Sequence, residues 1–330
     1  MRFEIVTIFP GFFSGFLENG VLRRALAEGL VEVAVHDLRA FTHDRHRTVD
    51  DRPFGGGEGM VLKPQPIAEA LASLGIEPKA VRACANPQEP QKCPGTTSVV
   101  PQEPVEEVGA SAPAEGAGGF GPRIEQPQPL RASAPEGIES PKHATVILLS
   151  AQGLPFTQAI AREIAGLDRV VLLCGRYEGV DERINQLYCD MELSIGDYVL
   201  SGGELAAAVV IDAAMRLLPG ALGNEASSEF ESFGVADAEI TTDADGVPRS
   251  QHGAGGLLDY PHYTRPAEFA SIAVPETLLN GDHQAIRRWR REQQLRKTLA
   301  NRPDLLEGAA LSNDDRKLLE SLRQQNAKEV

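Results

Sequence analysis

The chain has 330 residues, a net charge of −15 and 42% hydrophobic residues. This length supports a sizeable core and about two domains. No apolar run approaches the roughly 18 residues that cross a bilayer, and the N-terminal residues lack the basic and apolar regions of a signal peptide, so we expect a soluble, cytoplasmic protein. The four cysteines form no CxxC pair, which favours buried thiols over disulfides or metal ligands.

Predicted strands and helices alternate along the first two thirds of the chain. The apolar patterns predict strands at residues 3–9, 31–36, 80–83, 145–150 and 170–174. They predict helices at residues 11–17, 22–28, 66–74, 157–165 and 205–217. Strands separated by helix-length segments indicate a parallel sheet covered by helices, so the predicted fold class is α/β. From Pro261 onward only helices are predicted, including a basic one that contains Trp289 and a C-terminal one from Asp314.

Two segments interrupt this alternation. Residues 85–141 hold 11 of the 23 prolines and seven glycines. They show no apolar period, so we predict a disordered insertion, more typical of a tolerated surface insertion than of a partner-binding tail. Residues 234–256 look like a second, smaller mobile stretch. We therefore expect an α/β domain at residues 1–222, a mobile linker at 223–259 and a helical domain at 260–330.

The negative charge of the chain is concentrated in these two regions. Residues 85–141 and 225–258 carry −5 and −6 of the net −15, whereas residues 284–303 hold seven Lys or Arg and one Glu. Because the local field is what binds a phosphate backbone, a basic face is compatible with an acidic total. The overall charge therefore does not exclude nucleic acid.

Three glycine-bearing loops lie near the carboxyl ends of predicted strands, at residues 148–153, 174–179 and 194–204. In the third, residues 198–200 look like a short strand before the Gly202–Gly203 pair, an order that holds phosphate in many nucleotide-binding proteins. None of the loops is a GxGxxG or GxxxxGKS/T motif, and their mostly acidic charges would repel a pyrophosphate. A ligand with a positive centre and a neutral ring, such as S-adenosylmethionine, suits them better. The alternative is that these glycines only end strands and start helices.

The early stretch FTHDRHRTVDDRPFGGGEGM, residues 41–60, combines three Arg and two His with three Asp, followed by four glycines in five residues. The glycines permit a backbone that approaches a ligand closely, and the Arg and His side chains can meet phosphates or a purine. A solvated surface loop is the alternative interpretation.

This early stretch, together with CGRYEGVDER, SIGDYVLSGGE, LLPGALGNEASS and GLLDYPHYTRP, closely resembles the bacterial tRNA (guanine-N1)-methyltransferase family TrmD. The segment IRRWRREQQLRKT resembles its tRNA-binding domain. The resemblance covers nearly the whole chain apart from the two insertions. It implies a SPOUT methyltransferase, with a deep trefoil knot in the α/β domain that is an exception to the rule against knots. It also implies an obligate homodimer whose active sites are built from both subunits.

The resemblance assigns an S-adenosylmethionine pocket to residues of the three glycine loops. These are Leu148, Leu149, Ser150, Gly175, Tyr177, Glu178, Ile195, Gly196, Tyr198, Leu200, Gly202 and Gly203. Two positions depart from the family pattern, since Ala151 and Ala206 stand where prolines are usual, which loses some backbone stiffness.

Methylation of guanine nitrogen 1 requires a base to remove that nitrogen's proton and a cation to stabilise the charge that develops on the oxygen. By resemblance the base is Glu231, where the family has an aspartate, with Glu229 as its rival. Arg216 matches a motif arginine expected to orient the guanine or its phosphate. A surface arginine at a helix end is the alternative for Arg216.

The resemblance also implies contacts with the tRNA substrate. His46, Asp50 and Gly59 are expected at the target nucleotide, and phosphate contacts are expected at Arg287, Arg288, Arg290, Arg291 and Lys297. Trp289 either stacks on a base or packs within the helical domain. A magnesium ion is a family expectation that no ligand cluster in the sequence demonstrates, and no metal ligand is assigned.

The predicted activity is therefore methyl transfer from S-adenosylmethionine to nitrogen 1 of guanosine 37 in tRNA, beside the anticodon. Two alternatives remain. The glutamate at position 231 makes a catalytically impaired RNA-binding homologue conceivable. A nucleotide-dependent oxidoreductase would fit the order of strand, glycine and helix alone, but the missing GxGxxG motif and the acidic loops count against it.

Overall fold

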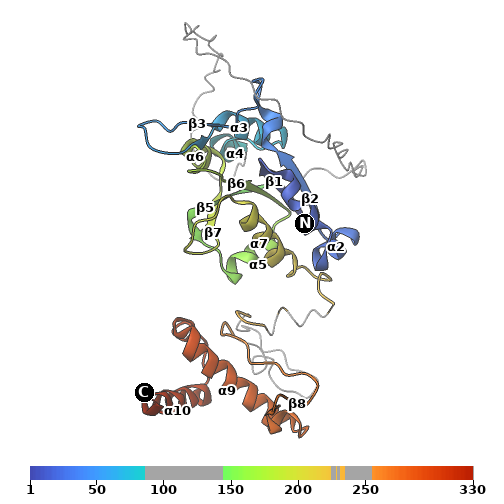
Figure 1. Ribbon diagram of the computed structural model, residues 1–330, viewed down its shortest axis with the longest axis vertical. Coiled ribbons are helices and arrows are strands. Elements are labelled where there is room, and N and C mark those ends of the chain that lie inside the picture. The colour runs from blue at the N-terminus through green and yellow to red at the C-terminus, as the bar shows by residue number, and fades with distance from the viewer. Residues whose placement is uncertain (86–143, 224–227, 229–230, 235–254, 330) are drawn as a thin grey trace. The chain divides into compact units, whose positions relative to one another are not determined.

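The computed structural model describes residues 1–85, 144–223, 228, 231–234 and 255–329 (Figure 1). The insertion predicted at residues 85–141, apart from Ala85, and most of the stretch predicted at 234–256 therefore lie outside the described residues.

A five-stranded parallel sheet with the order β2-β1-β6-β5-β7 organises the α/β part of the chain. Its strands are β1 (Arg2–Thr7), β2 (Glu32–Asp37), β5 (Thr145–Pro155), β6 (Arg169–Cys174) and β7 (Met191–Ser194). A separate two-stranded ladder joins β3 (Asp50–Asp51) to β4 (Val61–Leu62). The helices of this part are η1 (Pro10–Phe13), α1 (Ser14–Leu17), α2 (Gly20–Ala27), η2 (Leu38–Phe41), α3 (Pro64–Ser73), α5 (Gln158–Ala165), α6 (Glu182–Tyr188) and α7 (Glu204–Met215).

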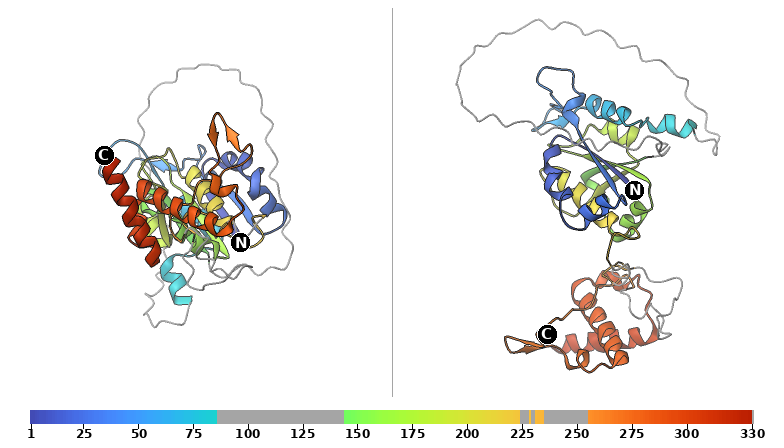
Figure 2. Two further views of the ribbon diagram at one scale, coloured as in Figure 1. Left: turned by 90° about the horizontal axis from the view of Figure 1, so that it is seen from below. Right: turned by 90° about the vertical axis from the view of Figure 1, so that its right-hand side faces the viewer.

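Both faces of the sheet are covered, as the two views of Figure 2 show. Ile147 and Leu149 belong to one apolar cluster, with residues of α2, α5 and α7. Val146 and Leu148 belong to the other, with residues of α3 and α6. Because successive side chains of a strand point to opposite faces, a strand buried on both sides is apolar at every position. The continuous apolar run of β5 therefore places alternate residues in two cores.

Most of the predicted elements are confirmed, and two strand predictions are wrong. Residues 79–85 form a helix, α4 (Lys79–Ala85), where a strand was expected at 80–83, since three alanines in seven residues favour a helix. Residues 198–200 are not a strand, and the side chain of Val199 is 87% exposed. The strand before the third glycine loop is instead β7, which has only four residues and a weak pattern.

The C-terminal part of the chain consists mainly of helices. Its elements are β8 (Glu268–Phe269), β9 (Ile272–Ala273), η4 (Glu276–Leu278), α9 (His283–Asn301), η5 (Pro303–Leu306) and α10 (Asn313–Glu329). The short β8–β9 hairpin was not predicted. A small core of five leucines joins α9, η5 and α10: Leu257, Leu295, Leu306, Leu319 and Leu322. None of the helices described here is long and apolar enough to cross a membrane.

Candidate active site

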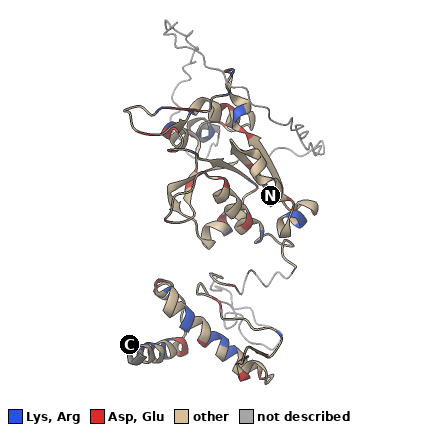
Figure 3. Ribbon diagram, in the orientation of Figure 1, with Lys and Arg blue, Asp and Glu red and all other residues tan. Residues whose placement is uncertain are grey.

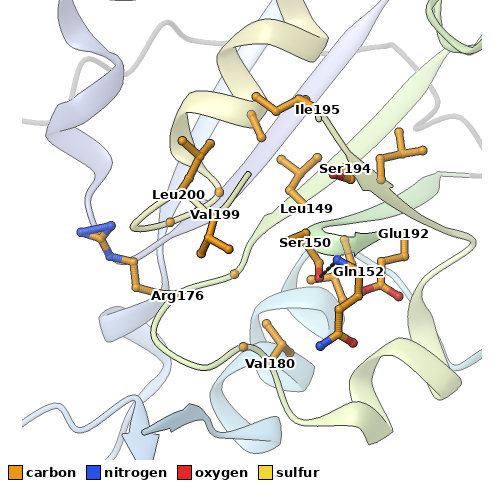
Figure 4. A pocket seen from close by; sticks show the side chains of 18 of the residues that line it. Leu149, Ser150, Gln152, Arg176, Val180, Glu192, Ser194, Ile195, Val199 and Leu200 are labelled. Atoms are coloured by element: carbon orange, nitrogen blue, oxygen red, sulfur yellow. Dashed lines mark hydrogen bonds between the residues drawn. The ribbon is translucent and has the colours of Figure 1, made fainter. Parts of the chain in front are cut away.

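A cavity of about 310 Å³ lies where β5, β6 and β7 end (Figure 4). In parallel α/β sheets this carboxyl edge is where ligands bind. The twelve residues that the resemblance assigns to the cofactor all line this one cavity: Leu148, Leu149, Ser150, Gly175, Tyr177, Glu178, Ile195, Gly196, Tyr198, Leu200, Gly202 and Gly203. Ala151 and Ala206, which replace the usual prolines, line it too.

The first wall of the cavity is a bulge within β5. Leu149 and Leu154 both pair with Leu193 of β7, so the four residues between them are displaced from the ladder. Within this bulge the backbone N–H of Gln152 donates to Ser150 Oγ at 3.1 Å. A Cβ on Gly153 would lie 2.5 Å from the backbone of Glu192, so only glycine fits there. A bulge of this kind redirects side chains without ending the strand.

The other two walls approach each other through glycines. The N–H of Gly203 donates to the carbonyl of Gly175 at 2.9 Å, and Gly202 forms a backbone bridge with Arg176. A Cβ on Gly203 would lie 2.8 Å from Cys174 Cα, closer than side chains normally approach a backbone. Two loops that are about 27 residues apart in the sequence are thus held in direct backbone contact.

Side chains behind the glycines fasten the same two loops. Arg176 donates from Nη1 to the carbonyl of Ser201 at 2.7 Å, and its guanidinium lies 4.4 Å from the ring centroid of Phe9. Glu204 is buried, accepts a 2.8 Å hydrogen bond from Thr7 Oγ1, and lies 3.8 Å from Arg176 Nη1. Sequence reasoning counted Arg176 and Glu204 as loop charges and missed this role, although the place of Glu204 at the start of α7 was a signal.

The charged residues that line the cavity suit a cationic ligand. Three carboxylates, of Glu178, Glu182 and Glu192, line it together with one guanidinium, of Arg176. This balance opposes a pyrophosphate and favours a ligand with a sulfonium and an ammonium group. The glycine walls leave backbone groups to meet a ring. The residues present therefore fit S-adenosylmethionine. Burial, and secondarily the Glu204 carboxylate, raises the pKa of the Cys174 thiol, so that it stays neutral behind the cavity.

The early loop is bonded to the edge of this cavity. The N–H of Glu178 donates to the carbonyl of Met60 at 3.0 Å, and β4 bridges to Val180, which lines the cavity. A Cβ on Gly59 would lie 2.5 Å from the side chain of Glu178. Gly59 is thus brought to the cavity, whereas His46 lies exposed in the loop and Asp50 pairs with Leu62 in the β3–β4 ladder.

One residue, Asp44, sets the shape of that loop. Its carboxylate accepts hydrogen bonds from the N–H of His46 and from both the N–H and the hydroxyl of Thr48. The hydroxyl bond is the main cause that lowers the pKa of Asp44 below its ordinary value. Sequence reasoning missed Asp44, since an aspartate among other charges gives no signal of its partners.

The two predicted catalytic residues contact each other and do not line the cavity of their own chain. Arg216, just after α7, donates from Nη1 to Glu231 Oε1. This hydrogen bond raises the pKa of the Arg216 guanidinium above its ordinary value. Neither residue is among those that line the cavity. Within one chain, Arg216 and Glu231 therefore lie together but outside this cavity.

Arg162 of α5 holds the same linker segment and was missed from the sequence. Its Nη2 donates to the carbonyl of Phe233 at 2.9 Å. Burial lowers the pKa of Arg162, and the nearby Glu231 carboxylate opposes that shift. Glu231 thus lies near the Arg162 guanidinium as well as in a hydrogen bond with Arg216.

The basic helix is α9, where the ribbon is blue at the Lys and Arg positions in Figure 3. Arg288, Arg290 and Lys297 are exposed and Arg287 is half-buried. Arg291 differs, because it pairs with Asp315 on α10. Its Nε lies 3.0 Å from Asp315 Oδ1, and its Nη2 lies 3.0 Å from Asp315 Oδ2. The prediction of a phosphate contact at Arg291 conflicts with this bidentate pair, and we reassign the residue to helix packing. The pairing spans 24 residues and leaves no local trace in the sequence.

No group of three or more His, Cys, Asp or Glu side chains in the described ranges is arranged to hold a metal ion.

The chain is similar to known proteins over nearly its whole length. The family model described as tRNA (Guanine-1)-methyltransferase TrmD matches residues 1–92 and 112–308. A tRNA (guanine-N(1)-)-methyltransferase of Koribacter versatilis is 46% identical over 98% of this chain and 98% of its own. Proteins of the same name from Heliobacterium modesticaldum and Dehalococcoides mccartyi are 41% and 38% identical, over 98% and 100% of this chain and 92% and 100% of their own.

Proposed function

Because the chain belongs to the tRNA (guanine-1)-methyltransferase family TrmD, we propose that it methylates ring nitrogen 1 of guanosine 37 in tRNA, beside the anticodon. The methyl donor of this proposal is S-adenosylmethionine. The observation that carries the proposal is the single cavity at the ends of β5, β6 and β7, lined by all twelve residues expected at the donor. A tRNA substrate also implies that the enzyme works in the cytoplasm.

The donor supplies, when bound, an electrophilic methyl group on a sulfonium. The chain must supply the rest of the reaction. Glu231 takes the proton from nitrogen 1 of the guanine, which frees that nitrogen's lone pair to bond the methyl carbon as the carbon–sulfur bond of the donor breaks and a neutral thioether leaves. Arg216 meets the guanine oxygen and stabilises the negative charge that develops there. For this to happen, the Glu231 carboxylate exchanges its hydrogen bond from Arg216 for one from the guanine N–H.

A homodimer completes the site in this proposal. Glu231 and Arg216 lie outside the cavity of their own chain, which supports a site where the pair of one subunit serves the cavity of the other. Close backbone contacts between Gly203 and Gly175, and at Gly153, support the trefoil knot of the SPOUT fold, because threaded segments must pass one another without side chains. The domain boundaries at residues 222 and 259 belong to the same proposal.

The test is methyl transfer from S-adenosylmethionine to an unmodified tRNA transcript, with mass spectrometry to find the modified base. We expect 1-methylguanosine at position 37 and no product when that guanosine is replaced by adenosine. Glu231→Gln should lower kcat by roughly 10²- to 10⁴-fold, the usual contribution of a general base. Glu229→Gln is the matched control, with the same change two residues earlier, and should stay within about threefold of native kcat.

Each failure identifies an alternative. A native enzyme without activity that still binds tRNA would indicate an RNA-binding homologue. Full activity in Glu231→Gln would remove that residue from the base role. Calorimetry that detects NAD binding and no S-adenosylmethionine binding would support an oxidoreductase. A requirement for Mg²⁺ stays a prediction of the family resemblance, which chelation in the same assay tests.

A further inference from the structure

A second cavity, of about 430 Å³, lies within the helical part of the chain and is used by none of the steps above. Its volume falls in the roughly 300–1,000 Å³ range of small-molecule sites. Four ring-bearing side chains line it, from Tyr260, His262, Tyr263 and Trp289. We refer to it below as the aromatic cavity.

The rings come from two elements that converge. Tyr263 lies 6.2 Å from Trp289 of α9, and Tyr260 lies 4.8 Å from His262, measured between ring centroids. The planes of these pairs are tilted by 59° and 47°. Tyr263 is 47% exposed, so a ring at the mouth of the cavity remains open to solvent. Aromatic faces that are partly open are suited to receive another flat ring.

Cationic groups accompany the rings. The guanidinium of Arg290 lies 4.8 Å from the ring centroid of Tyr260, and Arg265 also lines the cavity. Trp289 and Arg290 follow Ile286 on α9 at spacings of three and four, which puts all three on one helix face. An aromatic and cationic lining is the composition that binds unstacked nucleobases in single-stranded nucleic acid.

The wall is ordered before any ligand arrives. The Asp259 carboxylate accepts a 2.7 Å hydrogen bond from the N–H of Tyr260 and lies 2.9 Å from His262 Nε2. The N–H of Asp259 donates to Ser232 Oγ at 2.9 Å. On the other wall, Asp282 caps α9 by accepting from the N–H groups of Gln284 and Ala285. A preorganised wall loses little entropy on binding.

We propose that the aromatic cavity binds an unpaired, unstacked base of the tRNA substrate, other than the guanine that is methylated. This rests on the proposed function, because that function supplies a loop of unpaired bases next to the target. The basic surface of α9 provides the complementary charge, since Arg287 and Arg288 lie on the same helix and can meet the phosphates that flank the base. Stacking sets affinity here and takes no part in the chemical step.

The chain's single tryptophan gives a direct readout. Titration of the native enzyme with a heptanucleotide RNA of anticodon-loop sequence should quench Trp289 fluorescence in a saturable way. The same oligonucleotide with every base removed should leave the fluorescence unchanged at equal phosphate concentration. Equal quenching by both probes would overturn the proposal. A fluorescence change that depends on protein concentration without RNA would also overturn it, and would make the cavity an interface between copies of the chain.

Kinetics of variants give an independent test. Tyr263→Ala should raise KM for tRNA about tenfold and leave kcat within about twofold, because one aromatic–base stack is lost. Tyr263→Phe keeps the ring and should stay near the native KM. Phe269→Ala is the matched control, because it removes an aromatic ring that is 74% exposed and lies outside the cavity. A circular dichroism spectrum and a urea unfolding transition of Trp289 fluorescence close to those of the native chain show that the helical part of Tyr263→Ala is folded.

These outcomes separate the two proposals. A native enzyme that methylates tRNA while Tyr263→Ala keeps the native KM refutes only the base-binding role. A native enzyme that does not methylate tRNA refutes the proposed function, and the heptanucleotide titration still decides whether the cavity binds a base.

Discussion

The cavity beside β5, β6 and β7, where the proposed function places the methyl donor, is called the donor cavity here. The donor cavity and the aromatic cavity have similar volumes, about 310 and 430 Å³, but different walls. The donor cavity is bounded largely by backbone, with Gly175, Gly202 and Gly203 at the points of closest approach. The aromatic cavity is bounded by side chains, above all Tyr263 and Trp289. Adding a side chain should therefore disrupt the donor cavity, whereas removing an aromatic ring should disrupt the aromatic cavity.

The parts of the fold that hold the two cavities also differ. The donor cavity is held by a hydrogen-bonded parallel sheet with a core on each face. The helical part has a core of five buried leucines, with the Arg291–Asp315 pair beside it. Small cores contribute few kcal/mol, so single polar contacts weigh more in their stability. Substitutions should therefore act on donor affinity in one region and on stability or tRNA affinity in the other.

Among the substitutions that compare the two cavities, Gly203→Val is expected to have the largest effect. Its Cβ would lie 2.8 Å from Cys174 Cα and 3.0 Å from Gly175 N, and a backbone within a sheet edge cannot easily give way. Overpacking of this kind costs up to about 3 kcal/mol, which corresponds to roughly a hundredfold loss of S-adenosylmethionine affinity. Calorimetry measures the affinity, and circular dichroism checks that the variant is folded.

Gly15→Ala is the matched control for that change, because a Cβ at Gly15 meets no atom within 4 Å. It should bind the donor like the native chain. Native affinity in Gly203→Val would mean that the two loops separate freely, and the proposed backbone wall would then be wrong.

Asp315→Asn should destabilise the helical part by about 2 kcal/mol, less than for a fully buried pair, because Arg291 and Asp315 keep some solvent contact. Burial by itself raises the pKa of Asp315, but the bonds from Arg291 and Ser312 outweigh it and hold the pKa below its ordinary value. A carboxyl with a lowered pKa stabilises the folded state above about pH 4, and this stabilisation is lost as the pH falls further. The difference in the free energy of unfolding between the native chain and Asp315→Asn should therefore narrow below that pH.

Urea unfolding followed by Trp289 fluorescence measures this difference, since the only tryptophan of the chain lies on α9. Asp314→Asn is the control, because Asp314 is adjacent but 96% exposed in its side chain. A difference between native and Asp315→Asn that stays constant from pH 7 to pH 3 would show that charge at Asp315 is not what stabilises the pair.

The two regions also differ in how far they could be predicted from sequence. Apolar patterns predicted β1, β2, β5 and β6, and the clearest signals were the continuous apolar runs of β5 and β6, which are typical of buried parallel strands. These patterns missed β7 and misassigned residues 198–200, since four residues give too short a period to distinguish a strand from an exposed apolar loop. The residues that line the first cavity followed from the family resemblance of motifs that each lie within a single loop.

Contacts between distant segments could not be predicted in this way. Arg291 lies in a basic segment typical of phosphate contacts, and only the fold shows that its guanidinium is hydrogen-bonded to Asp315. Likewise the hydrogen bond from Arg162 to the Phe233 carbonyl joins residues that are 71 positions apart. The aromatic cavity gathers rings from residues 260–263 and 289, and the sequence left open whether Trp289 stacks or packs. Such sites depend on which helix face meets which loop, and local patterns do not encode that choice.

The smallest effect separates charge from stacking within the helical part of the chain. Arg288 is exposed on α9, so Arg288→Ala should remove one phosphate contact, weaken tRNA binding about threefold and reduce the salt slope of log Kd by about one. Tyr263→Ala should weaken binding more while leaving the slope unchanged, because stacking releases no counterions. Filter binding at four salt concentrations measures both slopes, and both variants should keep native donor affinity. If Tyr263→Ala changed the salt slope as Arg288→Ala does, its loss of tRNA affinity would come from a displaced basic face of α9. The contrast between a cavity walled by rings and one walled by backbone would then no longer hold.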